Sequence, residues 1–387
     1  MNRYSLCLVG AYVPDYTRVN VIMCGCEAND ISIEHARVEP SSPFKRKRRL
    51  RQLLRRRPIT TDFALVPAFC HHEVAVARKF YEGPLIFDPL ISRHLTKIHD
   101  YRKAGRFSIH ALRNYVADKR SLTLADYVLS DTLAHKRYFH EKYGIPAEKI
   151  FPVYVGYNAD HFQPGPSYSH QTAVIGFYGS FIPLHGIEVI IHAAHLLRHR
   201  SDIRFELVGN GHTRASMEKL AKSLNLENTV FSGQVQYENL PVYIGRWDIC
   251  LGIFGSTLKA DLVIPNKVYH YAACRRPIIT KDSPAIRELF TDGRDIVLSP
   301  ANPRALADRI AALVDNRDRA ETIAARGRRM ISEGYNHRRI GRRMLELFTE
   351  WKTSAMREER HETNRGYLPK ARWYENICRG RRQWTGQ

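Results

Sequence analysis

The chain has 387 residues, of which 44% are hydrophobic and 26% charged, and its formal net charge is +21. This length can form two ordinary domains, and no apolar run reaches the roughly 18 residues that a membrane span needs. The composition favours a globular protein, excludes a membrane-spanning one, and makes nucleic acid, an anionic lipid surface or a polyanionic substrate the candidate partners.

The seven cysteines lack the close, even spacing of a disulfide framework, which favours a reducing compartment and a cytoplasmic protein. Cys24-Gly-Cys26 and Cys70-His71-His72 lack a second pair at metal-finger spacing, so we interpret them as buried thiols and loop histidines. Residues 5–13 have no small-residue cleavage site and are interpreted as a buried strand, not a signal peptide.

In chain order, β-branched apolar runs alternate with amphipathic stretches, the pattern of parallel strands connected by helices. The strands predicted in the first half lie near 4–10, 33–37, 62–66, 84–88, 126–130 and 150–154. The helices predicted there lie near 18–29, 72–81, 106–122 and 132–143. Residues 158–173, rich in Pro, Gly and Ser, are the best linker candidate.

The same alternation restarts after the linker. The predicted strands lie at 173–179, 204–209, 228–233, 248–255, 277–280 and 295–300. The predicted helices lie at 186–198 and 213–224, from Pro265, from Pro284, and at 303–315 and 318–332. From 336 onward the chain is predicted to be helical and basic.

This pattern predicts two doubly wound α/β domains, an N-terminal one over 1–164 and a C-terminal one over 165–335. Residues 336–387 would form helices and a basic tail that pack back on the N-terminal domain. In open parallel sheets a ligand lies beyond the carboxyl ends of the strands, so we expect the site in the cleft between the two domains.

Small residues end the strands of the second sheet, among them Gly179, Gly209, Gly211, Gly233 and Gly252. Such tips let a ligand approach the backbone, and this repetition is hard to explain by packing.

Residues 265–267, Pro-Asn-Lys, open a predicted helix. Proline suits the first helical turn, so Asn266 and Lys267 lie where free backbone amides point, and Lys259 adds a second positive charge. Amides and ammonium groups together suit a diphosphate. The alternative is that Lys267 is a solvated helix residue.

The order and spacing of several segments resemble the glycosyltransferase family 4 group, the group 1 glycosyltransferases. The resemblance covers essentially all of 173–335, and the first half more loosely through PLIFD, LADYVLSDT and VGYNADHFQP. It implies the GT-B fold of two Rossmann-like domains. The segments that carry it are GSFIPLHG, VGNGH, FSGQV, DICLGIFG, VIPNKVYHYAACRRPIIT and SPAIRELFTDG.

The resemblance implies a retaining transfer of a sugar from a nucleotide-diphosphate donor to a membrane-linked or polysaccharide acceptor, without a cofactor or a required metal. The C-terminal domain would bind the donor and the N-terminal domain the acceptor. Cations stabilise the departing diphosphate in such a transfer, which makes Lys259 and Lys267 catalytic candidates. The matching donor-binding positions are Gly179, Ser180, His185, Gly209, Gly211, Val235, Asn266 and His270.

The sequence departs from the family pattern at charged positions. Many relatives carry an Arg and a Lys where this chain has Ser180 and His185, of which only the histidine can be charged. The family's two glutamates are separated by seven residues, the first near the donor sugar and the second binding the nucleotide ribose, and they are replaced here by Leu262 and His270. Asp261 is a candidate substitute for the first, and His270 would either bond the ribose or only pack.

Two further candidates lie in the first half. Relatives place a histidine after a central strand, near the donor sugar, and the matching segment here offers Asp88. Asp88 is a catalytic candidate that would bind sugar hydroxyls or stabilise an oxocarbenium-like centre, and the alternative is that it caps the next turn. Gly10 matches a loop that approaches donor and acceptor, and His71 and His72 are lesser candidates.

The missing charges keep a second hypothesis open, in which the chain is a catalytically degenerate GT-B-like nucleotide-binding or regulatory subunit.

Residues 44–57 predict a basic amphipathic helix of the kind that lies on an anionic membrane. Phe44, Leu50, Leu53 and Leu54 approximate its apolar face, and Trp373, Tyr374 and Trp384 in the tail would suit the same interface. Nucleic acid is the less favoured partner because no recognition motif accompanies the charge, and a plain solvated charge run is the other alternative. The predicted membrane-binding residues are Lys45, Arg46, Lys47, Arg48, Arg49, Arg51, Arg55, Arg56 and Arg57.

Overall fold

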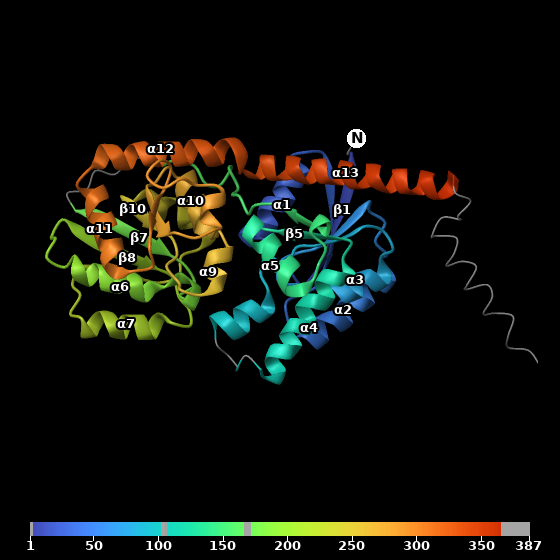
Figure 1. Ribbon diagram of the computed structural model, residues 1–387, viewed down its shortest axis with the longest axis horizontal. Helices are drawn as coiled ribbons and strands as arrows, with labels where there is room; N and C mark the ends of the chain where they lie inside the picture. Colours follow the sequence, from blue (N-terminus) through green and yellow to red (C-terminus); the bar gives the residue numbers. More distant parts are fainter. Residues whose placement is uncertain (1–2, 102–104, 106, 166–171, 365–387) are drawn as a thin grey trace, which may run out of the picture. The chain divides into compact units, whose positions relative to one another are not determined.

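The computed structural model describes residues 3–101, 105, 107–165 and 172–364, and residues 1–341 form one compact unit with two parallel sheets. The first sheet has the strand order β2-β1-β3-β4-β5-β6, and Figure 1 labels its strands β1 and β5. Its central strands are almost wholly buried, as parallel strands covered on both faces must be. Its strands are β1 (Tyr4–Gly10), β2 (Ile31–Arg37), β3 (Phe63–Val66), β4 (Leu85–Phe87), β5 (Tyr127–Ser130) and β6 (Ile150–Pro152).

Helices connect these strands close to the predicted positions. The helix expected at 106–122 begins at Ile109 because the Ser108 hydroxyl accepts a hydrogen bond from the Ala111 amide. The π-helix η1 (Leu95–Asp100) was not predicted. The other helices of this half are α1 (Thr17–Glu27), α2 (Pro43–Arg56), α3 (Val74–Phe80), α4 (Ile109–Leu124), α5 (Leu133–Tyr143) and the 3-10 turn η2 (Ala147–Lys149).

The second sheet has the order β12-β11-β10-β7-β8-β9, also parallel, which confirms the expected pair of doubly wound sheets. The expected boundary at 164/165 lies between the last strand of one sheet and the first strand of the other. The strands are β7 (Ala173–Tyr178), β8 (Ile203–Val208), β9 (Thr229–Ser232), β10 (Ile249–Leu251), β11 (Ile278–Lys281) and β12 (Val297–Ser299).

Apolar side chains of β7, α6 and α11 form the core of this half, among them Ile175, Ile191 and Ile310, which are fully buried. The short helices α8 and α9 were not predicted. The helices are α6 (Ile187–Leu196), α7 (Arg214–Ser223), α8 (Leu240–Gly245), α9 (Leu258–Leu262), α10 (Asn266–Ala273), α11 (Pro303–Val314), α12 (Arg317–Gly334) and α13 (His337–Asn364). The 3-10 turns are η3 (Pro183–His185), η4 (Tyr237–Asn239) and η5 (Ile286–Glu288).

The start of α5 is tied to the second half of the unit. The Thr132 hydroxyl donates to the Leu262 carbonyl at 2.6 Å, and the Glu288 carboxylate accepts from the amides of Leu133 and Ala134, both at 2.7 Å. These bonds satisfy amides that a helix start leaves unpaired. They fix the loop after β5 beside the loop that leads into α10.

The contacts divide the chain after Gly341, so residues 342–364 of α13 belong to a second unit. The predicted tail aromatics Trp373, Tyr374 and Trp384 lie outside the described residues, and packing of the C-terminal segment on the N-terminal domain stays a prediction. In the described ranges, no helix has the length and apolarity needed to cross a membrane.

Candidate active site

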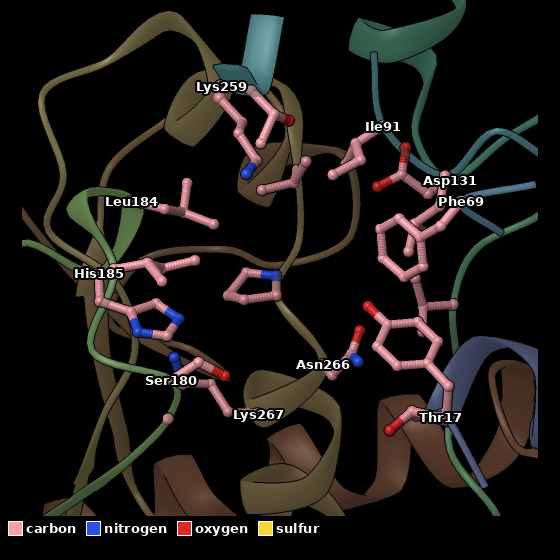
Figure 2. A pocket seen from close by; sticks show the side chains of 18 of the residues that line it. Thr17, Phe69, Ile91, Asp131, Ser180, Leu184, His185, Lys259, Asn266 and Lys267 are labelled. Carbon is pink, nitrogen blue, oxygen red and sulfur yellow. The ribbon is translucent and has the colours of Figure 1, made fainter. Parts of the chain in front are cut away.

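A cavity of about 500 Å³ opens where the carboxyl ends of both sets of strands meet, and residues of both halves line it. This is where loops and helix starts converge in doubly wound sheets. Figure 2 shows Asp131 and Phe69 on one side of it and Ser180 and His185 on the opposite side. Of the predicted donor-binding and catalytic residues, the lining includes Gly179, Ser180, His185, Lys259, Asn266, Lys267 and His270.

Lys267 lies at the start of α10, beside the uncapped amides of that helix. The helix begins at Asn266 after Pro265, whose backbone is extended, and no side chain caps it. Lys267 is buried, with only 4% of its surface exposed, and its ammonium lies 4.6 Å from the centre of the Phe177 ring. No carboxylate in the described ranges pairs with this ammonium. Burial lowers the pKa of Lys267 to about 7. An anion bound here would restore its charge.

Lys259 also lines the cavity, but its charge is shared. Its ammonium lies 3.2 Å from Asp100 of η1, whose carboxylate also accepts a hydrogen bond from the Thr257 hydroxyl at 3.1 Å. Burial lowers the pKa of Lys259, and Asp100 opposes this shift. Lys259 therefore connects the two halves of the unit as well as facing the cavity.

His185 is not the cation that its position suggested. The residue is buried behind the exposed Ser180, and no hydrogen bond to its Nδ1 occurs within the described structure. Burial, together with the charges of Lys267 and Lys259, holds the pKa of His185 well below its usual value. A neutral ring can offer a hydrogen bond at this wall, but no charge.

His270 both packs and presents a polar atom. Its ring stacks on Phe162 with 3.8 Å between ring centres, and its Nδ1 shares a 2.6 Å hydrogen bond with the Tyr178 hydroxyl. Its Nε2 is buried without a partner in the part of the chain described, and burial lowers the pKa of His270 to about 3. The ring is neutral and has one unused nitrogen.

Asp88 does not line the cavity, contrary to expectation. It is fully buried in an ion pair with Arg18, whose Nε lies 2.8 Å from the carboxylate. Arg18 also donates to the carbonyls of Val153 and Tyr154. The pair joins the end of β4 to α1 and to the segment after β6, which is a structural role.

Several other predicted residues also lie outside the lining. Asp261, the candidate substitute for the first glutamate, does not line the cavity and forms an ion pair of 2.8 Å with Lys281. A Cβ on Gly209 or Gly211 would lie 2.0 Å from the carbonyl oxygen of Gly179 or Ser180, and both have positive φ. These two glycines therefore serve backbone packing, and they shape the 179–180 loop from behind. Gly10 and Val235 are also absent from the lining.

The first half contributes residues that the motifs did not reveal. Tyr16, Phe69, Arg93 and Asp131 line the cavity, as does the lesser candidate His71, and burial lowers the pKa of His71 to about 3. Asp131 directly follows β5, and a polar residue at the end of a strand was the signal that could have found it.

The basic segment is a helix, as predicted, but its apolar face is occupied. Leu50 and Leu54 of α2 are buried in the protein, whereas Phe44 is 73% exposed. The apolar stripe is thus unavailable for insertion into a membrane. Arg46 pairs with the buried Glu73, and Lys47 is half-buried. The predicted basic residues that stay exposed are Lys45, Arg48, Arg49, Arg51, Arg55, Arg56 and Arg57.

The described residues contain no group of three or more His, Cys, Asp or Glu side chains that could hold a metal ion.

Comparisons with known proteins agree with this geometry. Residues 172–316 match the family model of group 1 glycosyl transferases. Alpha-D-kanosaminyltransferase of Streptomyces kanamyceticus is 23% identical over 187 residues, which are 46% of this chain and 45% of that protein. The chain thus spans less than half the length of the curated relatives it matches.

Solved structures match nearly the whole chain. Sucrose-phosphate synthase from Thermosynechococcus elongatus gives a TM-score of 0.73 at 16% identity, with 91% of this chain and 100% of that chain covered. HepE from Anabaena, solved in complex with UDP and glucose, gives a TM-score of 0.69 at 16% identity, with 89% of this chain and 99% of that chain covered. The fold that the sequence resemblance implies is thereby confirmed: the chain has the GT-B fold. Residues 172–316 are similar to the group 1 glycosyl transferases.

Proposed function

We propose that this chain is a glycosyltransferase whose cavity binds a nucleotide-diphosphate sugar and transfers the sugar, with retained anomeric configuration. The acceptor is a membrane-linked or polysaccharide molecule. The observation that carries the proposal is Lys267, a buried lysine beside the free amides of α10 that has no carboxylate partner among the described residues. The family match over 172–316 supports the same activity.

The chemistry follows from the charges. When the bond between sugar and diphosphate breaks, negative charge grows on the departing phosphate. Preorganised amides and an ammonium group aimed at that charge stabilise the transition state more than the ground state. Lys267 and the start of α10 supply these groups, with Lys259 in support. The proposal assigns this neutralisation to the chain itself, without a resident metal or cofactor.

The nucleoside would lie against the aromatic side of the cavity. Tyr178, Tyr237 and His270 line this side, and the His161 ring stacks on Tyr237 at 4.8 Å. Flat rings of this kind suit a base. The unused Nε2 of His270 is the candidate partner for a ribose hydroxyl, in the place where relatives carry a glutamate.

The acceptor would enter from the side of Arg93. This half-buried guanidinium lines the cavity, and its Nε has no partner among the residues that the structure describes. Burial lowers the pKa of His72, and the charges of Arg93 and of Arg46 and Lys47 of α2 lower it further, so these cations lie near that ring. Positive charge therefore continues from the cavity to the exposed arginines of α2. An anionic membrane surface on the cytoplasmic side fits this charge.

A panel of UDP-, GDP- and ADP-sugars tests the proposal. We expect one nucleotide series to raise the melting temperature and its sugar conjugate to release free nucleoside diphosphate slowly in water. The released sugar should keep the anomeric configuration of the donor, which NMR of the fresh product reports. Binding without any turnover would favour the regulatory-subunit hypothesis, and no binding in any series would overturn the proposal.

A further inference from the structure

Asp131 is a buried carboxylate in the cavity that neither the motifs nor the diphosphate site explains. The residue is 2% exposed at its side chain and lies directly after β5, at the edge where the cavity opens. One carboxylate oxygen, Oδ1, accepts a 2.6 Å hydrogen bond from Nδ1 of His135, one helical turn away. No donor to the other oxygen, Oδ2, occurs in the described ranges.

Helix capping does not account for this side chain. The amides at the start of α5 are already bonded, those of Leu133 and Ala134 to Glu288 and that of His135 to the Thr132 hydroxyl. The buried Arg18 is not available to pair with Asp131, because its guanidinium bonds Asp88 and two backbone carbonyls. Asp131 thus retains an acceptor oxygen that neither a cap nor a salt bridge uses.

His135 fixes the direction of this oxygen. Its ring is fully buried and stacks on Phe139 with 4.6 Å between ring centres. The neighbouring Thr132 is bonded to the Leu262 carbonyl at 2.6 Å. Asp131 is therefore held beside the backbone of the position at which the family resemblance expects a glutamate near the donor sugar. A carboxylate oxygen at the cavity wall, with no donor among the described residues, can accept a hydrogen bond from a ligand hydroxyl.

We infer that Asp131, supplied by the first sheet and oriented by His135, accepts a hydrogen bond from a hydroxyl of the donor sugar. It takes over the contact that the leucine at 262 cannot make. Asp131 is thus a sugar-binding residue, and His135 is a positioning residue. This inference rests on the proposed function, because it places the sugar of a nucleotide-diphosphate donor in the cavity.

The test compares each nucleoside diphosphate with its glucose conjugate: UDP with UDP-glucose, GDP with GDP-glucose, and ADP with ADP-glucose. Calorimetric titration of the wild type should show tighter binding of the conjugate in one pair. In Asp131→Asn the amide oxygen can still accept from His135, but an NH₂ group replaces the free oxygen. The extra affinity due to the sugar should fall about tenfold or more, with affinity for the free diphosphate unchanged.

Asp126→Asn is the matched control, because Asp126 directly precedes β5 at its opposite end and loses the same charge. The Asp126 variant should keep the wild-type ratio between the affinities for the glucose conjugate and for the free diphosphate. If melting shows that Asp131→Asn is unfolded, Asp131→Ala replaces it. The inference would be overturned if the Asp131 variant kept the wild-type ratio between the affinities for the conjugate and for the free diphosphate, which includes equal weakening of both ligands. It would also be overturned if the wild type bound the conjugate no more tightly than the free diphosphate. A wild type that binds no nucleotide would overturn the proposed function itself.

Discussion

At the scale of single residues, burial decides which candidate side chains carry charge in the cavity. His185 and His270 are neutral near pH 7 because burial depresses their pKa values, whereas Lys267 has a pKa of about 7. Lys259 keeps a carboxylate partner, and Lys267 has none in the described structure. Lys267 is thus the group whose charge a bound diphosphate would change most.

Donor affinity should therefore depend on pH. Between pH 7 and 9 the free chain loses the proton of Lys267, so the affinity for UDP-glucose, whose phosphates do not titrate there, should fall by up to about tenfold per pH unit. His185 and His270 stay neutral throughout and add no slope. Titration calorimetry at several pH values measures this, and a flat profile would contradict the role of Lys267.

The stability of the ligand-free chain should change with pH in the opposite sense. The ordinary pKa of lysine is 10.5, so between about pH 7 and pH 10 the unfolded chain holds a proton that the folded chain has lost. Stability therefore rises with pH over this window relative to a Lys267→Met variant, which lacks the titrating group. Parallel pH dependence of both melting temperatures would argue against the depressed pKa.

Asp88→Asn should damage stability more than binding. The change leaves Arg18 buried without its charged partner, which costs about 3–5 kcal/mol in comparable buried pairs. The melting temperature should drop clearly, with nucleotide affinity kept within about twofold at temperatures where the variant is folded. Asp282→Asn, which breaks an exposed pair with Arg287, is the control and should change little. Lost transfer activity at an unchanged melting temperature would restore Asp88 as a catalytic candidate.

At the scale of elements, the sequence predicted the helix that carries Lys267 because its start is encoded locally. Pro265, Asn266 and Lys267 follow one another, and the structure starts α10 where expected. The amphipathic pattern of 44–57 also predicted α2. It could not show that Leu50 and Leu54 pack inside the protein, because the same stripe of leucines suits a protein core or a lipid surface.

The exposed arginines of α2 should hold the chain on anionic lipid by charge. Each contributes about 1 kcal/mol near such a surface, so replacing Arg48, Arg51 and Arg55 by Gln should weaken binding by tenfold or more. Flotation with vesicles of phosphatidylcholine and phosphatidylserine measures this, and raised salt should have the same effect. The control replaces the exposed Arg319, Arg326 and Arg329 of α12. Equal loss in both triple variants, or none in the α2 variant, would reject this surface.

At the scale of the whole compact unit, the site joins residues far apart in sequence. Asp131 and Lys267 line one cavity because two sheets present their carboxyl edges to it. The motifs located the donor half, where strand ends and helix starts lie within one segment. They missed Tyr16, Arg93 and Asp131, and they misplaced Asp88. Whether a polar side chain at a strand end meets the cavity or a buried arginine depends on tertiary packing.

The central claim is that the cavity binds a nucleoside diphosphate through Lys267. The most direct measurement is calorimetric titration, at pH 7, of the wild type and of Lys267→Met, which keeps the length of the side chain and removes its charge. Lys222→Met, an exposed lysine of the same half, is the control. The account predicts that the Lys267 variant binds the donor at least tenfold more weakly and the Lys222 variant normally. Equal affinity of the wild type and Lys267→Met would contradict it.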